Sequence, residues 1–431
     1  MPEACLDARS VDVGTRARIL NHISKHGQDT SFTEFFWKGC EPHPYELERY
    51  PLYAQVLALV SAGSSIDMTA RVTGVNPHSV RTWTRFEQMP KLAHYLCSYL
   101  RLGRPREGWT WLSVNNSSGH AIPLGPVVQV PRMISNWEEV AEVLAQLKPL
   151  EPLPVGLSRE FLFGFLVGML IGDSAKSRSK NWHRHVGLVL SMGYDTNKRI
   201  GDLTCICARS LGWRMHPTKD QPKPSHKPHG FYQWVSQASP LVDWIFNVVL
   251  GLKDGEVTTY DPVKMDWALS APEDFRRGLI QGTAESDGSV SIASQAVEFW
   301  IEPSRDFFME LLLTFGVKSF KNRQALTVTR SQVPRLGDVP AFSPLLKTAR
   351  YARFQKLLDA RHIDRGKRVP AEIRDFMLNN PESLPVPEVS ERVLDQFGVL
   401  LSFETVQRWA RKARMELDLA AVFLKAQKRP A

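Results

Sequence analysis

Hydrophobic and polar positions divide the chain into two helical ends and a mixed centre. Apolar residues recur at helical spacing before residue 103 and after residue 361, whereas short apolar runs alternate with helical patterns between them. The predicted fold class is therefore α+β, with all-α flanking domains. The predicted units are an N-terminal helical domain over residues 1–103, a connector over 104–157, central units over 158–255 and 256–360, and a C-terminal helical domain over 361–431.

The segment over residues 50–86 has the pattern of three short helices. Apolar side chains keep a helical period up to Val60, Gly74 suits a left-handed turn, and a last helix carries Val80 and Trp83 on one face. This pattern is typical of a helix-turn-helix unit whose last helix faces DNA. A helical hairpin with a buried Val and Trp explains it equally well. In the DNA-binding interpretation the exposed residues are His78, Ser79, Arg81, Thr82 and Arg85.

The C-terminal region repeats this pattern. A helix is predicted over residues 389–397, a turn follows at Gly398, and a second helix begins at Ser402. The strings SVRTWTR at 79–85 and TVQRWAR at 405–411 share a Val, a Trp and an Arg at the same spacing. We expect a second helix-turn-helix-like unit here, with Arg408 and Arg411 facing DNA.

The segment over residues 104–157 is rich in Pro, Gly, Ser and Asn. Such residues mark turns and loops, so the segment is interpreted as a connector. One helix is predicted within it, over residues 137–147.

Two nine-residue stretches in the centre look like copies of one another. They are LVGMLIGDS at 166–174 and IQGTAESDG at 280–288, each with Gly third, Asp eighth and another Gly four residues before the third position. Glycines four apart lie near one helix face, so two such helices can approach closely and bring Asp173 and Asp287 together at one end. The glycines of this predicted helix interface are Gly164, Gly168, Gly278 and Gly282.

The residues after each stretch also match. Two short strands are predicted, then a helix that ends at an apolar-Gly-apolar step, at Gly212 and at Gly316. A later strand and helix follow, so the order α-β-β-α-β-α occurs twice and predicts an internal duplication. These later elements are expected at 231–235 and 241–250 in the first copy, and at 325–329 and 345–358 in the second.

The two stretches resemble the LAGLIDADG motif of the homing endonuclease family, and the resemblance covers about residues 158 to 360. It implies tandem LAGLIDADG half-domains of αββαββα type that form a pseudo-twofold saddle. It further implies that Asp173 and Asp287 are the catalytic residues and bind Mg²⁺ or Mn²⁺. Two adjacent carboxylates repel one another unless a divalent cation lies between them, and their oxygens suit Mg²⁺. Such a site can hydrolyse phosphodiesters.

The sequence departs from the family pattern in several places. Ser174 ends the first motif where Gly is usual, and Gln281 occupies an apolar position in the second. The family commonly has a Lys near the end of a late strand, beside the metal site, and the corresponding residues here are Gln237 and Arg330. Glu285, the sixth residue of the second motif, is expected to cap the helix or support the site.

Charge favours a nucleic-acid partner. The formal net charge is +9, which suits a polyanion. Strand alternation places Lys176, Arg178 and Lys180 on one face after the first motif, and Ser289 and Ser291 on the equivalent face after the second. The resemblance places this face in the DNA major groove, where it would meet phosphates and base edges. The alternative is a solvated charged edge without a DNA contact.

Three functions fit these features. The leading hypothesis is a sequence-specific, divalent-metal-dependent double-strand DNA endonuclease, acting as a monomer through its internal pseudo-twofold symmetry. The alternative is a catalytically inactive, DNA-binding transcriptional regulator that uses the same fold with its helix-turn-helix domains. An RNA-splicing maturase is the third hypothesis, which leaves RNA open as a partner.

The remaining features limit location and cofactors. The chain has no apolar run of membrane-spanning length and no N-terminal signal pattern, so we expect a soluble protein of the cytoplasm or nucleoid without a membrane partner. Its five cysteines are irregularly spaced, and a zinc site is not expected.

Overall fold

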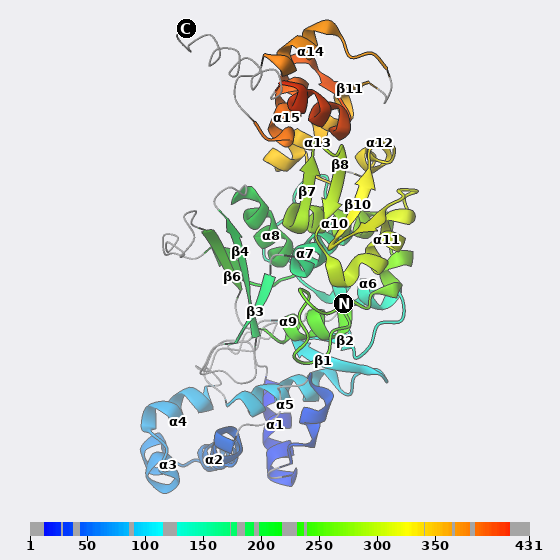
Figure 1. Cartoon of the computed structure of the whole chain (residues 1–431). Coiled ribbons are helices and arrows are strands. Elements are labelled where there is room, and N and C mark those ends of the chain that lie inside the picture. Colours follow the sequence, from blue (N-terminus) through cyan, green and yellow to red (C-terminus); the bar gives the residue numbers. More distant parts are fainter. Residues whose placement is uncertain are drawn as a thin grey trace, which may run out of the picture.

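The computed structural model has two four-stranded sheets at its centre, with helical regions at opposite ends (Figure 1). Of the predicted site residues, Asp173, Lys180 and Gln237 lie outside the described residues, as do the side chains of Lys176 and Arg178. The structure describes residues 13–26, 29–37, 44–85, 90–114, 127–172, 174–178, 186–193, 198–217, 231–236, 239–339, 341–363, 367–379 and 384–413.

The N-terminal region contains six helices in its described residues and has its own core. Side chains define the helix starts in the segment over residues 50–86. Ser65 accepts a hydrogen bond from the Met68 N–H, and Asn76 accepts one from the His78 N–H, while Gly74 turns the chain at φ 70°. The helices are α1 (Val13–His26), η2 (Ser31–Phe35), α2 (Pro44–Ser61), α3 (Ile66–Thr73), α4 (Pro77–Thr84) and α5 (Lys91–Leu102).

The segment over residues 104–157, interpreted from its composition as a connector with one helix, also contains two strands. An antiparallel hairpin of β1 (Trp109–Ser113) and β2 (Val127–Pro131) precedes α6 (Trp137–Gln146). Every side chain of β1 is buried. Trp111 packs into the N-terminal core, and Trp109 packs into the central core. A strand buried on both faces shows no alternation of apolar and polar residues, which explains why the sequence pattern missed it.

The two central units have the same architecture. The strand orders are β3-β4-β6-β5 and β7-β8-β10-β9, with every neighbouring pair antiparallel, so each strand has its counterpart in the other unit. The first unit comprises α7 (Arg159–Ile171), β3 (Ser174–Arg178), β4 (Val186–Gly193), α8 (Lys198–Ser210), β5 (Met215–Pro217), β6 (Phe231–Ser236), α9 (Pro240–Trp244) and the π-helical turn η3 (Ile245–Val249). The second comprises α10 (Glu273–Asp287), β7 (Gly288–Ser291), β8 (Ala296–Phe299), η5 (Glu302–Ser304), α11 (Arg305–Leu313), β9 (Phe320–Asn322), β10 (Ala325–Thr329) and α12 (Val333–Gly337).

The predicted duplication is thus present, with two corrections. Short strands β5 and β9 follow the steps at Gly212 and Gly316. Each unit therefore has four strands, as the αββαββα type implies, and not the three of the order inferred from the sequence pattern. Three-residue strands such as these lie below the length at which alternation is visible. The helix after β10 is α12, so the segment over residues 345–358 is not the counterpart of α9. Both step glycines have positive φ, 73° and 71°, and end their helices alike.

The C-terminal region joins the second unit through α13 (Ala349–Asp359). It contains β11 (Arg361–His362), α14 (Ala371–Leu378), α15 (Val386–Phe397), β12 (Val399–Leu400) and a helix over residues 403–413. Gly398 ends α15 at φ 63°, at the predicted turn. The Gln295 amide, from the turn between β7 and β8, donates to the Leu401 carbonyl at 2.7 Å. Among the described helices, none combines the length and apolar character that crossing a membrane requires.

Candidate functional site

The glycines of α7 and α10 let the two helix backbones touch. A Cβ added to Gly164 would meet the Phe275 carbonyl oxygen, and one added to Gly168 would meet the Leu279 carbonyl oxygen, each closer than 3.0 Å. The partner glycines are equally confined, Gly278 by the Phe161 carbonyl and Gly282 by the Phe165 carbonyl. All four predicted interface glycines therefore lie in the contact between α7 and α10. Only glycine fits where backbones meet this closely.

The same packing brings the carboxyl ends of the two helices together. A Cβ on Gly172, which immediately precedes Asp173 in the chain, would lie 2.8 Å from the Asp287 Oδ2 atom. Asp287 is the last residue of α10 and is half-buried. Its carboxylate therefore lies beside the end of α7. Asp173 itself lies outside the described residues.

Burial raises the pKa of Asp287 to about 6, because the ionised carboxylate loses hydration, and the nearby Arg350 partly opposes this shift. Arg350 is the second residue of α13, and its Nη1 donates to the carbonyl oxygens of Glu285 and Ser286. The guanidinium thus caps the end of α10 and places positive charge close to Asp287. Arg350 lies beyond both repeated motifs, so no motif pointed to it.

Glu285 supports the end of α10 from inside the protein. It has no exposed surface, and its Oε1 accepts a hydrogen bond from the Ser343 N–H at 2.8 Å. Burial raises the pKa of Glu285 to about 7, while the Ser343 N–H, Arg350 and the Thr348 hydroxyl all lower it. The Thr348 hydroxyl has the smallest of these effects on the pKa of Glu285. The Glu285 Oε2 atom makes no hydrogen bond of good geometry.

The sheet register moves Arg330 away from this site. Gly288 pairs with Phe299, Phe299 pairs with Leu326, and β10 then runs away from Asp287. Arg330 follows the far end of β10, roughly 13 Å along the strand direction at about 3.3 Å per residue. The sequence pattern predicted Arg330 beside Asp287, and this prediction is wrong. The basic group near this carboxylate is Arg350.

The predicted DNA-facing residues are placed as follows. Ser289 and Ser291 are half-buried and alternate with the buried Gly288 and Val290, so they share the more exposed face of β7. Lys176 and Arg178 belong to β3, the equivalent strand of the first unit. At the two ends of the molecule, Arg81, Arg85, Arg408 and Arg411 are all exposed.

One residue expected on the exposed face of α4 is buried. Thr82 is only 6% exposed, and its hydroxyl donates to the Ser79 carbonyl at 3.1 Å. A Thr hydroxyl that bonds back to its own helix can be buried at little cost, which a polarity pattern does not anticipate.

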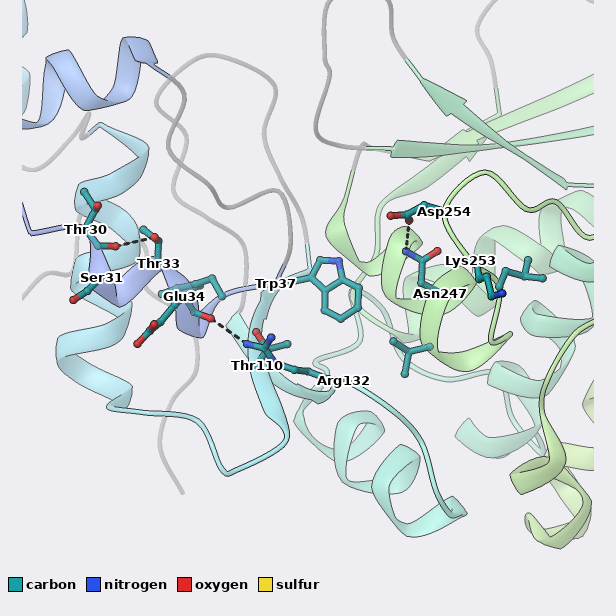
Figure 2. A pocket seen from close by; sticks show the side chains of 13 residues that line it. Thr30, Ser31, Thr33, Glu34, Trp37, Thr110, Arg132, Asn247, Lys253 and Asp254 are labelled. Atoms are coloured by element: carbon teal, nitrogen blue, oxygen red, sulfur yellow. Dashed lines mark hydrogen bonds between the residues drawn. The ribbon is translucent and has the colours of Figure 1, made fainter.

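A separate cleft lies where the N-terminal region meets the first unit (Figure 2). Its volume is about 810 Å³. Arg132 donates to the Glu34 carbonyl on one side, and the Asn247 amide donates to Asp254 on the other. Both charge signs line it, and none of its described lining residues is a predicted site residue.

Several solved structures are similar to the chain. They include the homing endonuclease I-DmoI in complex with DNA and Mn (13% identity, TM-score 0.31, 43% of this chain and 97% of that chain). The homing endonuclease I-WcaI bound to its DNA recognition sequence shows 11% identity and TM-score 0.31, over 50% of this chain and 93% of that chain. The N-terminal LAGLIDADG domain of DUF199/WhiA shows 15% identity and TM-score 0.29, over 50% of this chain and 96% of that chain.

No protein-family model matches the chain, and no curated protein matches its sequence.

Proposed function

We propose that the protein is a DNA endonuclease of the LAGLIDADG type, which binds double-stranded DNA and hydrolyses it with Mg²⁺ or Mn²⁺. The observation that carries this proposal is the backbone contact of α7 and α10. It places the Asp287 carboxylate beside Gly172, the chain neighbour of Asp173. Each unit has a glycine-rich helix: α10 ends at Asp287, and α7 ends at Ile171, two residues before Asp173 in the chain. In this proposal the two units supply the two halves of one site.

The donor set fits a hard divalent cation. Asp287 offers carboxylate oxygens whose ionised form burial disfavours, and a bound cation would reverse that preference. Asp173 and Asp287 would hold the ion, which when bound supplies an activated water and neutralises phosphate charge. The chain's own contribution is positional. Arg350 fixes the end of α10 and favours the ionised form of Asp287, while Glu285 anchors the adjoining Ser343 backbone.

DNA would contact three surfaces in this proposal. The first is the exposed face of the two sheets, with Lys176, Arg178 and Lys180 in one unit and Ser289 and Ser291 in the other. Exposed strands suit the major groove, and unequal residues in the two halves suit an asymmetric target. The end helices would add phosphate and base contacts as helix-turn-helix units through Arg81, Arg85, Arg408 and Arg411.

The test uses a randomised duplex library, incubated with the protein and Mg²⁺ or Mn²⁺, after which the DNA ends are sequenced. We expect defined ends that disappear in Asp287→Asn and in Asp173→Asn, because an amide oxygen holds the cation less strongly. Asp306→Asn is the matched control, since its side chain is 81% exposed on α11.

Selective DNA binding without cleavage in either metal would overturn the endonuclease and favour a DNA-binding regulator. Selective binding of RNA over duplex DNA in the same assay would favour the maturase hypothesis.

A further inference from the structure

A small cleft lies directly beside Asp287. Its volume is about 360 Å³, within the range of about 300–1,000 Å³ typical of pockets for small molecules. Its walls come from the ends of both motif helices, the loop before η4 (Asp266–Ser270), and the segment after β8. Its lining residues include Tyr260, Asp287, Trp300, Glu302 and Gln324.

Trp300 is held at this cleft with much of its ring exposed. Its backbone N–H donates to the Asp287 carbonyl at 2.9 Å, and its indole Nε1 donates to the Ser289 hydroxyl at 3.2 Å. The side chain is nevertheless 51% exposed. Two hydrogen bonds thus orient a large flat ring that the core does not bury.

Tyr260 is a second exposed ring on the same cleft, and it is 79% exposed. A hydrogen-bonded turn holds its backbone. The Tyr260 N–H donates to the Val257 carbonyl at 3.0 Å, and the Asp261 carboxylate accepts the Val257 N–H at 2.8 Å. Exposed aromatic rings that converge on one cleft indicate a binding surface.

The charges of the cleft decide what part of a nucleic acid fits. Asp287 and Glu302 line it, and none of the described lining residues is a Lys or Arg. Away from a bound cation, such a wall repels phosphate. The cleft instead suits an uncharged flat group whose exocyclic amines donate hydrogen bonds to the two carboxylates. The Gln324 side-chain amide can both donate a hydrogen bond to such a group and accept one from it. Nucleobases have these properties, and every base has a face that stacks on an aromatic ring.

We propose that this cleft takes one nucleobase, unstacked from DNA next to the cut, against Trp300 and Tyr260. Its place beside the cut rests on the proposed endonuclease function. The stacking itself needs no metal and no cleavage. Loss of one stacking ring weakens binding roughly 5- to 150-fold, because base–aromatic stacking is worth about 1–3 kcal/mol per base.

The probe is a short single-stranded DNA carrying one 2-aminopurine, a base whose fluorescence falls when it stacks. Binding is measured in EDTA with the full chain. We expect 2-aminopurine quenching with the unmodified protein. In Trp300→Ala and Tyr260→Ala the quenching is lost and the Kd rises roughly 5- to 150-fold. Trp300→Phe and Tyr260→Phe keep a ring and retain most of the quenching.

Leu313→Ala is the control, because Leu313 is an apolar side chain on α11 that is 57% exposed and does not line the cleft. Circular dichroism confirms that each variant folds. Unchanged Kd and quenching in both alanine variants would refute base stacking, even if the protein cuts DNA. Quenching that depends on both rings in a protein that never cuts would instead refute the endonuclease and leave the base site standing.

Discussion

Glu285 and Asp287 lie two residues apart at the end of α10, and burial disfavours the charge on both. Burial raises the pKa of each carboxyl, to about 7 and about 6 respectively. The two differ in access, because Asp287 lines a cleft whereas Glu285 has no exposed surface. Asp287 can therefore meet an external cation, while Glu285 acts on the stability of the fold.

Glu285→Gln should make the fold less sensitive to pH. The folded protein holds the Glu285 proton more tightly than the unfolded chain does, since its pKa rises from 4.5 to about 7. Its contribution to stability is therefore full below pH 4.5 and is lost as the pH rises through 7. Gln stays neutral and can still accept from the Ser343 N–H.

We compare the free energy of unfolding of Glu285→Gln with that of the unmodified protein at each pH. We expect this difference to shift by about 3 kcal/mol in favour of the variant between pH 4.5 and pH 8. Urea titrations across this range measure it, with the exposed Glu310→Gln on α11 as the control. Parallel pH profiles for all three proteins would contradict the expectation.

Arg350→Gln should shift the pH dependence of the proposed metal site upward. Arg350 lowers the pKa of Asp287, so its removal lets that pKa rise above about 6, and metal binding requires the ionised carboxylate. The pH midpoints of Mn²⁺ binding by calorimetry and of DNA cleavage should both increase. Arg353→Gln, one turn along α13, is the control because Arg353 pairs with Glu391 instead. Equal midpoints in the two variants would show that Arg350 acts only as a helix cap.

At the scale of elements, α7 and α10 form the structural centre of the molecule. They contact each other backbone to backbone, and each leads directly into the first strand of its sheet. Close approach strengthens packing along the whole contact, yet it leaves no room for a side chain at the glycines. The helix pair therefore fixes the distance between the two sheets and between the two carboxyl ends.

Gly168→Ala should destabilise the fold by at least about 2 kcal/mol, because the added methyl meets backbone atoms of Leu279 and Thr283 that cannot move alone. Gly337→Ala is the matched control, since a Cβ there meets only the end of the Leu358 side chain, at 3.1 Å and 3.2 Å. Thermal unfolding of both variants measures the difference. A similar small loss in each would mean that the helices can separate at little cost.

At the scale of the whole molecule, α13 connects the C-terminal region to the proposed site. Arg350 at its start caps α10, while Arg353 and Lys356 further along pair with Glu391 and Asp395 of α15. The pairs are about half exposed, so each contributes at most about 1 kcal/mol. The buried bond from Gln295 to Leu401 is the stronger link between the two regions.

Gln295→Leu should loosen the C-terminal region, because it leaves the buried Leu401 carbonyl without a donor at a cost of about 1–3 kcal/mol. Faster amide hydrogen exchange over residues 384–413 would show this, with unchanged protection in α7 and α10. Ser294→Ala is the control, as this neighbouring side chain in the same turn is exposed. Uniform loss of protection across the chain would instead indicate one cooperative unit.

The sequence by itself determined the elements whose patterns are local. Glycines four apart identified the α7–α10 interface, and the repeated spacing after them identified the duplication. Gly74 and Gly398 marked turns because their backbone conformation strongly favours glycine. These features depend only on neighbours along the chain, so a linear pattern contains them.

Only the tertiary structure decided which side chains meet. Arg350 reaches α10 from more than sixty residues away, and Trp300 and Tyr260 converge on the Asp287 cleft from separate loops. The prediction that Arg330 lies beside Asp287 is wrong, because strand register decides which end of β10 lies near Asp287. The order of the strands along the chain does not contain this information. The buried strand β1 carries no alternating pattern at all. Contacts between distant segments depend on packing and register, which no local spacing encodes.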